Sequence, residues 1–272
     1  MTPKADVFAF HEEDMETPVP IELANASALV FSRCHPEAAR ANQDGALVVA
    51  MPSGRGLLAV ADGMGGMPGG GQASRIALEA LAKSVLLVDD ASDASNALRS
   101  AILDGIELAN LEVIGMGIGA GTTLAVVETD GTSIRPYHVG DSSILVVGQR
   151  GKIKFQNVAH SPTGYALEAG FMEETEALLH QDRHVVSNIV GEDSMHIEVG
   201  MRIDLDTRDT VLVASDGLTD NLTVAEIVEI IRAGSLDEAA LALAEVCRQR
   251  MSTDEFGVPG KADDLTLVLY RA

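Results

Sequence analysis

The sequence predicts an α+β fold in which helices cover antiparallel sheets. Four β-rich runs follow one another between residues 122 and 157, and the short links between them favour antiparallel neighbours. Helical segments come in pairs, at residues 73–114 and 223–250. Strictly alternating strand–helix–strand units are absent, which argues against a Rossmann-like fold.

Length and composition predict one large domain with a short extension. The chain has 272 residues, of which 46% are hydrophobic, enough for a sizeable core. Residues 1–25 are polar and contain Pro18 and Pro20, so we expect a loosely attached N-terminal extension, with a single domain over 26–272. No apolar run has the length of a membrane span, and the acidic start lacks a secretion signal, so we expect a cytoplasmic protein.

In the first half of the chain, three predicted strands are followed by two predicted helices. A strand is expected at residues 26–31, and a pair of strands at 46–50 and 56–61 is joined by the turn-rich residues 51–54. Apolar residues at helical spacing then predict helices over 73–88 and 95–114.

The second half predicts a meander, an irregular segment and a closing helix pair. Thr223 and Glu226 have the spacing of a capping box, in which each side chain binds the other's backbone N–H, ahead of an apolar helix. Residues 159–200 are polar, with a short helical pattern at 173–180. The other expected elements are strands at 122–128, 133–139, 142–147, 152–157, 211–214 and 265–270, and a helix at 235–250.

Charge and cysteine content narrow the function classes. A formal net charge of −22 argues against a nucleic-acid backbone or an anionic membrane as the main partner. Cys34 and Cys247 have neither metal-site nor disulfide spacing, so we expect free thiols on two unrelated elements.

Carboxylates at strand ends are the most informative feature of the sequence. Asp62 and Asp216 each follow an apolar, strand-like run, and Asp263-Asp264 precedes another. A carboxylate at the end of a buried strand is costly to desolvate unless a partner compensates it. Three such ends, far apart in sequence, suggest carboxylates that converge on metal ions.

Each acidic position also has a purely structural interpretation. Asp62 lies in a glycine-rich turn and could bond its own backbone, Asp141 could be only a turn residue, and Asp220 could cap the following helix. A phosphate-binding loop at 69–73 would need a lysine that the segment lacks. Asp216 has no capping partner, so its functional interpretation is the stronger one.

An all-oxygen ligand set favours hard cations. No His or Cys accompanies the carboxylates at ligand spacing, so Mg²⁺ or Mn²⁺ fits better than Zn²⁺. Two ions bridged by a carboxylate can activate a water for attack on phosphorus without a Ser or Cys nucleophile.

With these motifs in order, the chain resembles the bacterial metal-dependent serine/threonine protein phosphatases of the PPM or PP2C-like family. The resemblance runs from about residue 26 to the final strand. Each motif alone is weak, whereas their order and spacing together are specific. The matching segments are Asn42-Gln43-Asp44, Asp62-Gly63-Met64-Gly65-Gly66, Gly121-Thr122-Thr123, Gly140-Asp141-Ser142, Ser215-Asp216-Gly217-Leu218 and Asp263-Asp264, with 180–186 similar to the region after the family's flap.

The resemblance implies a four-layer α-β-β-α sandwich of two antiparallel sheets flanked by paired helices, with a flap region at about 160–200. It implies two Mn²⁺ or Mg²⁺ ions at the catalytic centre. Asp62 would bridge them, and the carbonyl of Gly63 would bind one. Asp216 and Asp263 match the ligands of the other ion.

The resemblance also implies a third, weaker metal site. Asp141 matches its ligand, shared with Asp216 and reached by Asp220 through water. Asp44 matches a residue that holds metal-bound water.

Three positions depart from the family pattern. The family usually has a phosphate-binding Arg five residues before the position of Asp44, where this chain has Ala39. Arg40 is our first candidate for that role, through a bulge or irregular loop at 38–39, and Arg33 is the second. Met64 stands where some relatives have His, and Ser143 stands where Arg is common.

The resemblance implies hydrolysis of phosphoserine and phosphothreonine in proteins by a metal-activated water, in opposition to a Ser/Thr kinase. We expect a monomer. Two alternatives stay open: a weak or inactive member of the fold that binds a signalling partner, and a small-molecule phosphohydrolase.

Overall fold

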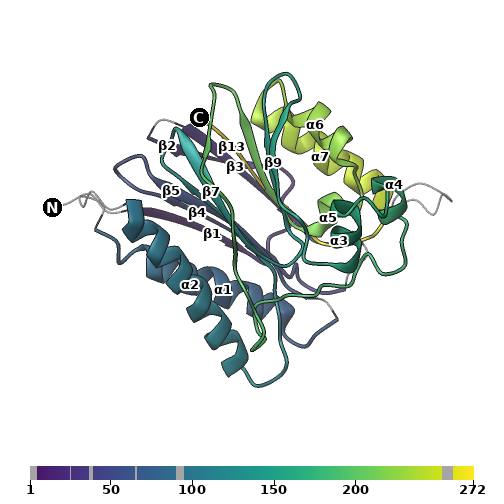
Figure 1. Cartoon of the computed structure of the whole chain (residues 1–272), viewed down its shortest axis with the longest axis horizontal. Helices are drawn as coiled ribbons and strands as arrows, with labels where there is room; N and C mark the ends of the chain where they lie inside the picture. The colour runs from purple at the N-terminus through teal and green to yellow at the C-terminus, as the bar shows by residue number, and fades with distance from the viewer. Residues whose placement is uncertain (1–4, 25, 37–38, 65, 90–94, 253–259) are drawn as a thin grey trace.

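Two antiparallel sheets lie face to face, and a pair of helices covers the outer side of each, in the computed structural model of the chain (Figure 1). The structure describes residues 5–24, 26–36, 39–64, 66–89, 95–252 and 260–272. The four layers confirm the predicted α+β sandwich.

The first sheet contains the hairpin predicted from residues 46–61. Its order is β1-β4-β5-β6-β7-β10, with β11 also paired to β7, and all pairings are antiparallel. Its strands are β1 (Asp6–His11), β4 (Asp44–Ala50), β5 (Gly56–Asp62), β6 (Leu124–Thr129), β7 (Ser133–Val139), β10 (Glu198–Val199) and β11 (Ile203–Asp204).

The second sheet places the last strand of the chain at its centre. Its order is β2-β3-β13-β12-β8-β9, again antiparallel. Its strands are β2 (Val19–Leu23), β3 (Ala26–Arg33), β8 (Ser143–Val147), β9 (Ile153–Gln156), β12 (Thr210–Ala214) and β13 (Leu265–Arg271).

Helices α1 (Gly70–Val85) and α2 (Ser95–Gly115) pack on the first sheet, and α6 (Val224–Ile231) and α7 (Leu236–Met251) pack on the second (Figure 1). The capping box of Thr223 and Glu226 is present as predicted. Three shorter helices are α3 (Pro162–Glu168), α4 (Glu174–Ala177) and α5 (Asp216–Thr219). None of the helices in the described ranges is long and apolar enough to cross a membrane.

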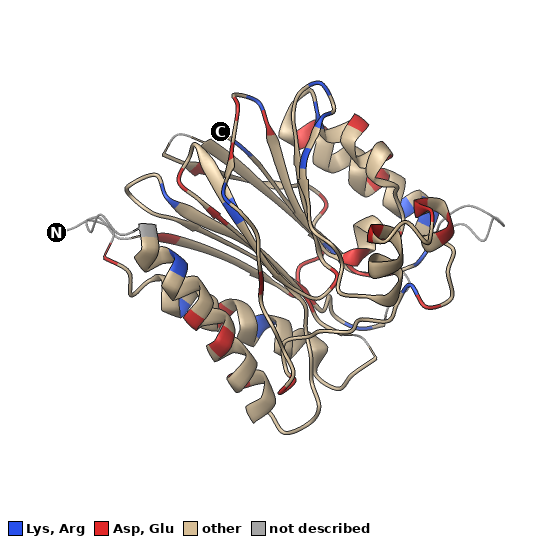
Figure 2. Ribbon diagram, viewed as in Figure 1, with Lys and Arg blue, Asp and Glu red and all other residues tan. Residues whose placement is uncertain are grey.

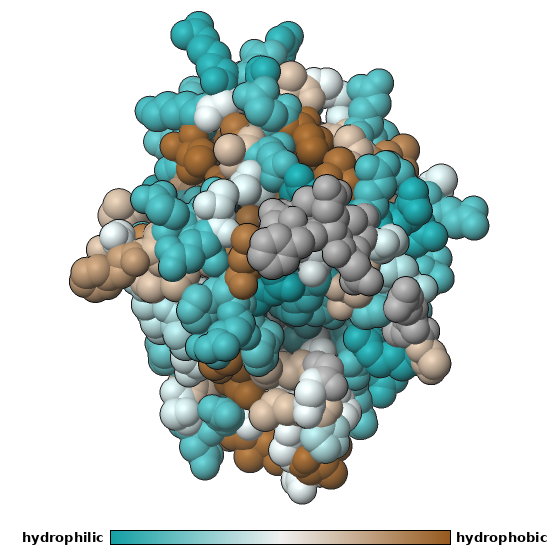
Figure 3. Space-filling view, turned by 90° about the vertical axis from the view of Figure 1, so that its right-hand side faces the viewer, coloured by the Kyte–Doolittle hydropathy of each residue, from teal (hydrophilic) through white to brown (hydrophobic). Residues whose placement is uncertain are grey.

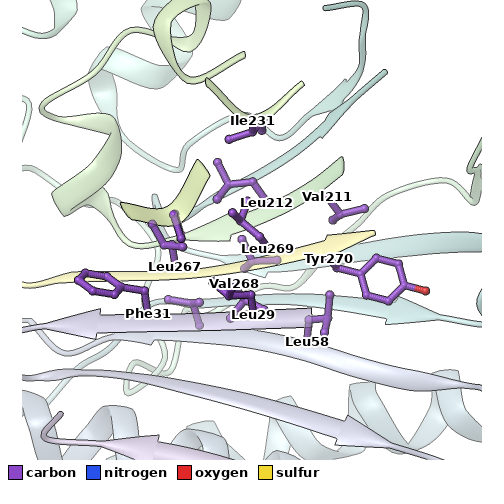
Figure 4. Packing of buried hydrophobic residues seen from close by; sticks show 14 of the residues in the cluster. Leu29, Phe31, Leu58, Val211, Leu212, Ile231, Leu267, Val268, Leu269 and Tyr270 are labelled. Atoms are coloured by element: carbon purple, nitrogen blue, oxygen red, sulfur yellow. The ribbon is translucent and has the colours of Figure 1, made fainter. Parts of the chain in front are cut away.

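The central strands β4, β5 and β6 of the first sheet are apolar on both faces because both faces are covered. In β4, Ala46 and Val48 face the core between the sheets, whereas Leu47 and Val49 face the helix pair. This two-residue alternation follows from the strand pleat. Figure 4 shows Leu58 of β5 and Leu29 of β3 within the core between the sheets.

The N-terminal segment is not the loosely attached extension that we predicted. Residues 6–11 and 19–23 form edge strands, one in each sheet, and the side chains of Met15, Ile21 and Leu23 are buried. The polar composition of residues 1–25 led to the wrong prediction because an edge strand needs an apolar side chain only at every second residue. Pro20 is tolerated there because an edge strand leaves backbone N–H groups unpaired.

The link at Gly140 is not the hairpin turn that short links favour. β7 belongs to the first sheet and β8 to the second, so 140–142 cross between the sheets. Gly140 has φ +101, and a Cβ there would lie 2.7 Å from the side chain of Thr123. Glycine is therefore required, and Asp141 enters the space where the sheets meet.

Strand registers bring the motifs to one end of the sandwich. In the second sheet, Arg33 pairs with Leu265, and Ala214 pairs with both Leu267 and Ser143. In the first sheet, Asp44 pairs with Asp62. The strand ends that carry the acidic motifs therefore share one end of the sandwich.

Candidate metal centre

Asp44 and Asp62 form the floor of an acidic centre. They are directly opposite one another on β4 and β5. Asp44 is buried, and its Oδ2 has no hydrogen-bond partner among the described residues. Burial, and then the charge of Asp264, raises the pKa of Asp44 well above its ordinary value. Burial, and then the charge of Asp44, does the same to the pKa of Asp62.

The backbone around Asp62 is held tightly. The carbonyl of Asp62 accepts from the Thr122 hydroxyl at 2.8 Å and from the Thr123 N–H at 2.9 Å. A Cβ at Gly63 would lie 2.4 Å from the backbone of Gly70 at the start of α1. Glycine at this position thus lets the start of α1 approach the turn after Asp62.

The other carboxylates reach the same centre from the second sheet. Asp216 begins α5 and Asp220 follows it. Burial, and then the charges of Asp216 and Asp220, raises the pKa of Asp141 from 3.8 to about 8. Burial, and then Asp216, raises the pKa of Asp220 to about 7. Burial is the main cause of both pKa shifts, and the nearby charge of Asp216 is the next. Acidic segments gather where the strand ends meet α5 (Figure 2).

The adjacent carboxylates Asp263 and Asp264 have separate surroundings. Burial, and then Asp216, raises the pKa of Asp263, which belongs to the centre. Asp264 instead ties down the loop between β3 and β4. It accepts from the backbone N–H groups of His35 at 2.8 Å and Gln43 at 2.7 Å, and from Arg40.

Arg40 lies near the centre, and Arg33 lies apart from it. Nη1 of Arg40 is 2.5 Å from Oδ2 of Asp264. Arg40 lies in a loop and not on a strand. Strand alternation therefore does not decide where Arg40 points, and the predicted bulge falls partly on Ala38, outside the described residues. Arg33 is half-exposed and lies 3.8 Å from Asp14. Both arginines line a cavity of about 380 Å³ whose lining contains no predicted metal ligand.

Lys261 is the residue of the centre that the sequence interpretation missed. Its Nζ lies 2.5 Å from Asp216, 2.8 Å from Asp220 and 3.1 Å from Asp263. The sequence feature that could have pointed to Lys261 was its position two residues before Asp263. This feature was weak, because the direction of a lysine side chain next to a strand start cannot be predicted.

A cluster of imidazoles lies beside the centre. Ligand atoms of His138, His160 and Glu198 lie within 4.8 Å of one another. Nδ1 of His160 accepts from the Gly140 N–H at 3.1 Å and from Asn188 at 2.8 Å, so its proton sits on Nε2, which faces Glu198 at 3.2 Å. That nitrogen has no lone pair for a metal, and the cluster instead supports the Gly140 crossing.

A cavity of about 590 Å³ opens next to the acidic centre. Asp141, Asp216 and Asp220 line one part of it. Apolar side chains from the irregular segment and from the α6 start line another part, among them Leu167, Leu178 and Val224, and Arg183 also lines the cavity. Figure 3 faces the side of the molecule on which α3 to α7 lie, where hydrophilic and hydrophobic side chains are interspersed.

Comparisons with known proteins agree with this architecture. Residues 33–247 match the family model described as Protein phosphatase 2C. The Streptococcus pneumoniae protein phosphatase PhpP is 32% identical over 186 residues, which cover 66% of this chain and 74% of that protein. The S. agalactiae serine/threonine phosphatase structure has a TM-score of 0.76 at 27% identity, covering 91% of this chain and 99% of that one. A structure of the catalytic domain of PstP with two manganese ions has a TM-score of 0.70 at 24% identity, covering 90% and 97%.

Proposed function

This chain belongs to the protein phosphatase 2C family, and from that premise we propose that its acidic centre uses divalent cations to hydrolyse phosphoserine and phosphothreonine in proteins. Its relatives are named serine/threonine protein phosphatases, and enzymes of this type are metal-dependent. All the carboxylates expected for catalysis are present at one end of the sandwich, which favours an enzyme over a binding protein.

The observation that carries the proposal is the facing pair of Asp44, which is buried, and Asp62, which is partly buried. Two carboxylates in this position repel each other, and a cation between them removes the repulsion. The oxygen-only donor set fits Mn²⁺ or Mg²⁺, as does the Oδ2 of Asp44, which has no hydrogen-bond partner among the residues that the structure describes. When bound, such ions lower the pKa of a water molecule and offset the charge of the phosphoryl group.

We propose the following roles for the residues of the chain. Asp62 and the carbonyl of Gly63 hold one ion, and Asp62 with Asp216 and Asp263 holds the other. Asp44 orients water next to them. Asp141, Asp216 and Asp220 provide a third, weaker site.

Arg40 is our candidate for orienting the phosphate. Its ion pair with Asp264 fixes it on the loop that leads directly to Asp44. A guanidinium offers paired donors to phosphate oxygens. Arg33 stays the second candidate, with less support because its ion pair is with the exposed Asp14, whereas Arg40 contacts Asp264.

The 590 Å³ cavity supports a protein substrate over a small phosphate ester. It adjoins Asp141, Asp216 and Asp220, and its apolar walls can receive side chains that flank a phosphorylated residue. A phosphoprotein substrate requires a Ser/Thr kinase that this enzyme opposes. We further propose one domain, which β1 and β2 extend to residue 6, acting as a cytoplasmic monomer.

Phosphate release tests the proposed function. The purified protein is assayed with a phosphothreonine peptide and with an aryl phosphate, in Mn²⁺ and in excess EDTA. We expect turnover of both substrates only with metal, and a higher kcat/KM for the peptide. Full turnover in EDTA would overturn the metal role, and turnover of the aryl phosphate alone would favour a small-molecule phosphohydrolase.

A further inference from the structure

Lys261 is built into the acidic centre. Its side chain is 20% exposed, and its ammonium contacts one oxygen on each of Asp216, Asp220 and Asp263. The contact with Asp216 is a hydrogen bond of 2.5 Å, and those with Asp220 and Asp263 are ion pairs.

The backbone of Lys261 is fixed to the same segment that carries two of these carboxylates. Asn221 is fully buried. Its Oδ1 accepts from the Lys261 N–H at 3.0 Å, and its Nδ2 donates to the Lys261 carbonyl at 2.9 Å and to the Gly217 carbonyl at 2.9 Å. One buried amide therefore ties Lys261 to α5, so the lysine cannot drift from the carboxylates as a surface lysine would.

We infer that Lys261 is an internal cation that competes with metal ions for the oxygens of Asp216, Asp220 and Asp263. This inference rests on the metal assignment of the proposed function. In the metal-free protein the ammonium stabilises the carboxylate cluster. A divalent ion that binds the same oxygens must displace the ammonium, so Lys261 weakens metal binding at this side of the centre.

The charge of the lysine is secure. Burial alone would lower the pKa of Lys261, but the carboxylates of Asp216, Asp220 and Asp263 outweigh burial and raise it.

The test compares Lys261→Gln with a matched lysine elsewhere. Lys154 also contacts two carboxylates, Asp206 at 2.6 Å and Asp209 at 2.5 Å, but outside the centre. Mn²⁺ binding is measured by calorimetry on protein stripped with EDTA. We expect Lys261→Gln to bind Mn²⁺ about tenfold more tightly or to gain a site, while its Tm in EDTA falls by about 5 °C. Lys154→Gln should bind Mn²⁺ like the wild type, and Lys261→Arg, which keeps the charge, should not bind more tightly.

Lysine labelling of the wild-type protein gives a second readout that does not depend on a variant folding. Reductive methylation is followed by mass spectrometry of peptides. We expect Lys261 to be protected in EDTA and to become several-fold more reactive in Mn²⁺, relative to Lys154.

The outcomes separate the inference from the proposed function. Equal Mn²⁺ affinity in the wild type and Lys261→Gln, or unchanged labelling of Lys261 in Mn²⁺, would overturn the role of Lys261 alone. A wild-type protein that binds no Mn²⁺ would overturn the metal assignment as well.

Discussion

Asp44 and Asp62 are cross-strand partners on β4 and β5, so two carboxylates face each other, with Asp44 buried and Asp62 partly buried. Side chains directly opposite in an antiparallel pair have Cβ atoms about 5 Å apart. Like charges directly opposite each other destabilise a sheet, and a bound cation would remove this repulsion. The pair therefore marks the site more clearly than either residue does alone.

Neutralising one member of this pair should stabilise the metal-free protein. We expect Asp44→Asn to raise the free energy of unfolding in EDTA by about 1–2 kcal/mol, since a buried charge without a partner is removed. The Mn²⁺-induced rise in Tm should shrink in the same variant. Thermal melts with and without Mn²⁺ measure both effects, and a lower Tm in EDTA would contradict the repulsion.

The stability of the metal-free protein should fall as the pH rises from about 6.5 to 8. The pKa of Asp141 is raised to about 8 and that of Asp220 to about 7, so the folded state keeps protons that the unfolded state has released. Stability from such groups is complete below about 3.8 and is lost as the pH rises through the folded values.

The pH window is chosen to avoid an opposing group. Burial, and then the charge of His160, lowers the pKa of His138 from 6.5 to about 4, so His138 favours folding more as the pH rises, but only below about 6.5. Tm in EDTA is measured across the window for the wild type and Asp141→Asn. The variant should show a smaller slope, and an equal slope would show that Asp141 does not titrate as described.

Replacing Arg40 should impair phosphopeptide handling more than replacing Arg33. We expect Arg40→Ala to raise KM for a phosphopeptide about tenfold, because a charged hydrogen bond to the phosphate is lost. Arg33→Ala is the matched control and should change KM less than twofold, since Arg33 faces Asp14. A larger effect of Arg33→Ala would move the phosphate contact to the end of β3.

Adding a methyl group at Gly217 should disrupt the centre through the backbone. A Cβ at this position would lie 1.9 Å from the Asp264 carbonyl oxygen, so the backbone of α5 or of the segment at Asp264 would have to shift. Gly217→Ala should cost about 3 kcal/mol of unfolding free energy and reduce turnover. Gly66→Ala is the control, because no atom of the described part of the chain lies within 4 Å of its added Cβ. Wild-type stability of Gly217→Ala would mean that α5 and the 263–264 segment adjust easily.

Local patterns identified most elements of this fold. The capping box at Thr223 and the hairpin of β4 and β5 form as their spacing predicts, because both depend on residues close together in sequence. The carboxylates at strand ends were also visible, because an apolar run ending in Asp is a local pattern.

Features that depend on distant partners were not predictable in the same way. Residues 140–142 could turn back or cross to the other sheet, and the strands that pair with β8 decide which. One of these partners, β12, is more than 60 residues away in sequence. The position of Lys261 depends on hydrogen bonds between its backbone and Asn221. The pairing of β1 and β2 depends on the sheet edges that they cover. The roles of Arg40 and of the individual carboxylates stay predictions.

Mn²⁺ stoichiometry measured together with turnover tests the central claim most directly. Bound Mn²⁺ is counted by equilibrium dialysis, and phosphate release from a phosphothreonine peptide is measured on the same samples of wild type, Asp62→Asn and Asp216→Asn. We predict at least two Mn²⁺ per wild-type chain, and in each variant the loss of at least one ion with a fall in turnover of about 100-fold or more. Either variant keeping near wild-type turnover with its ions lost would contradict the claim that these carboxylates hold the catalytic metals.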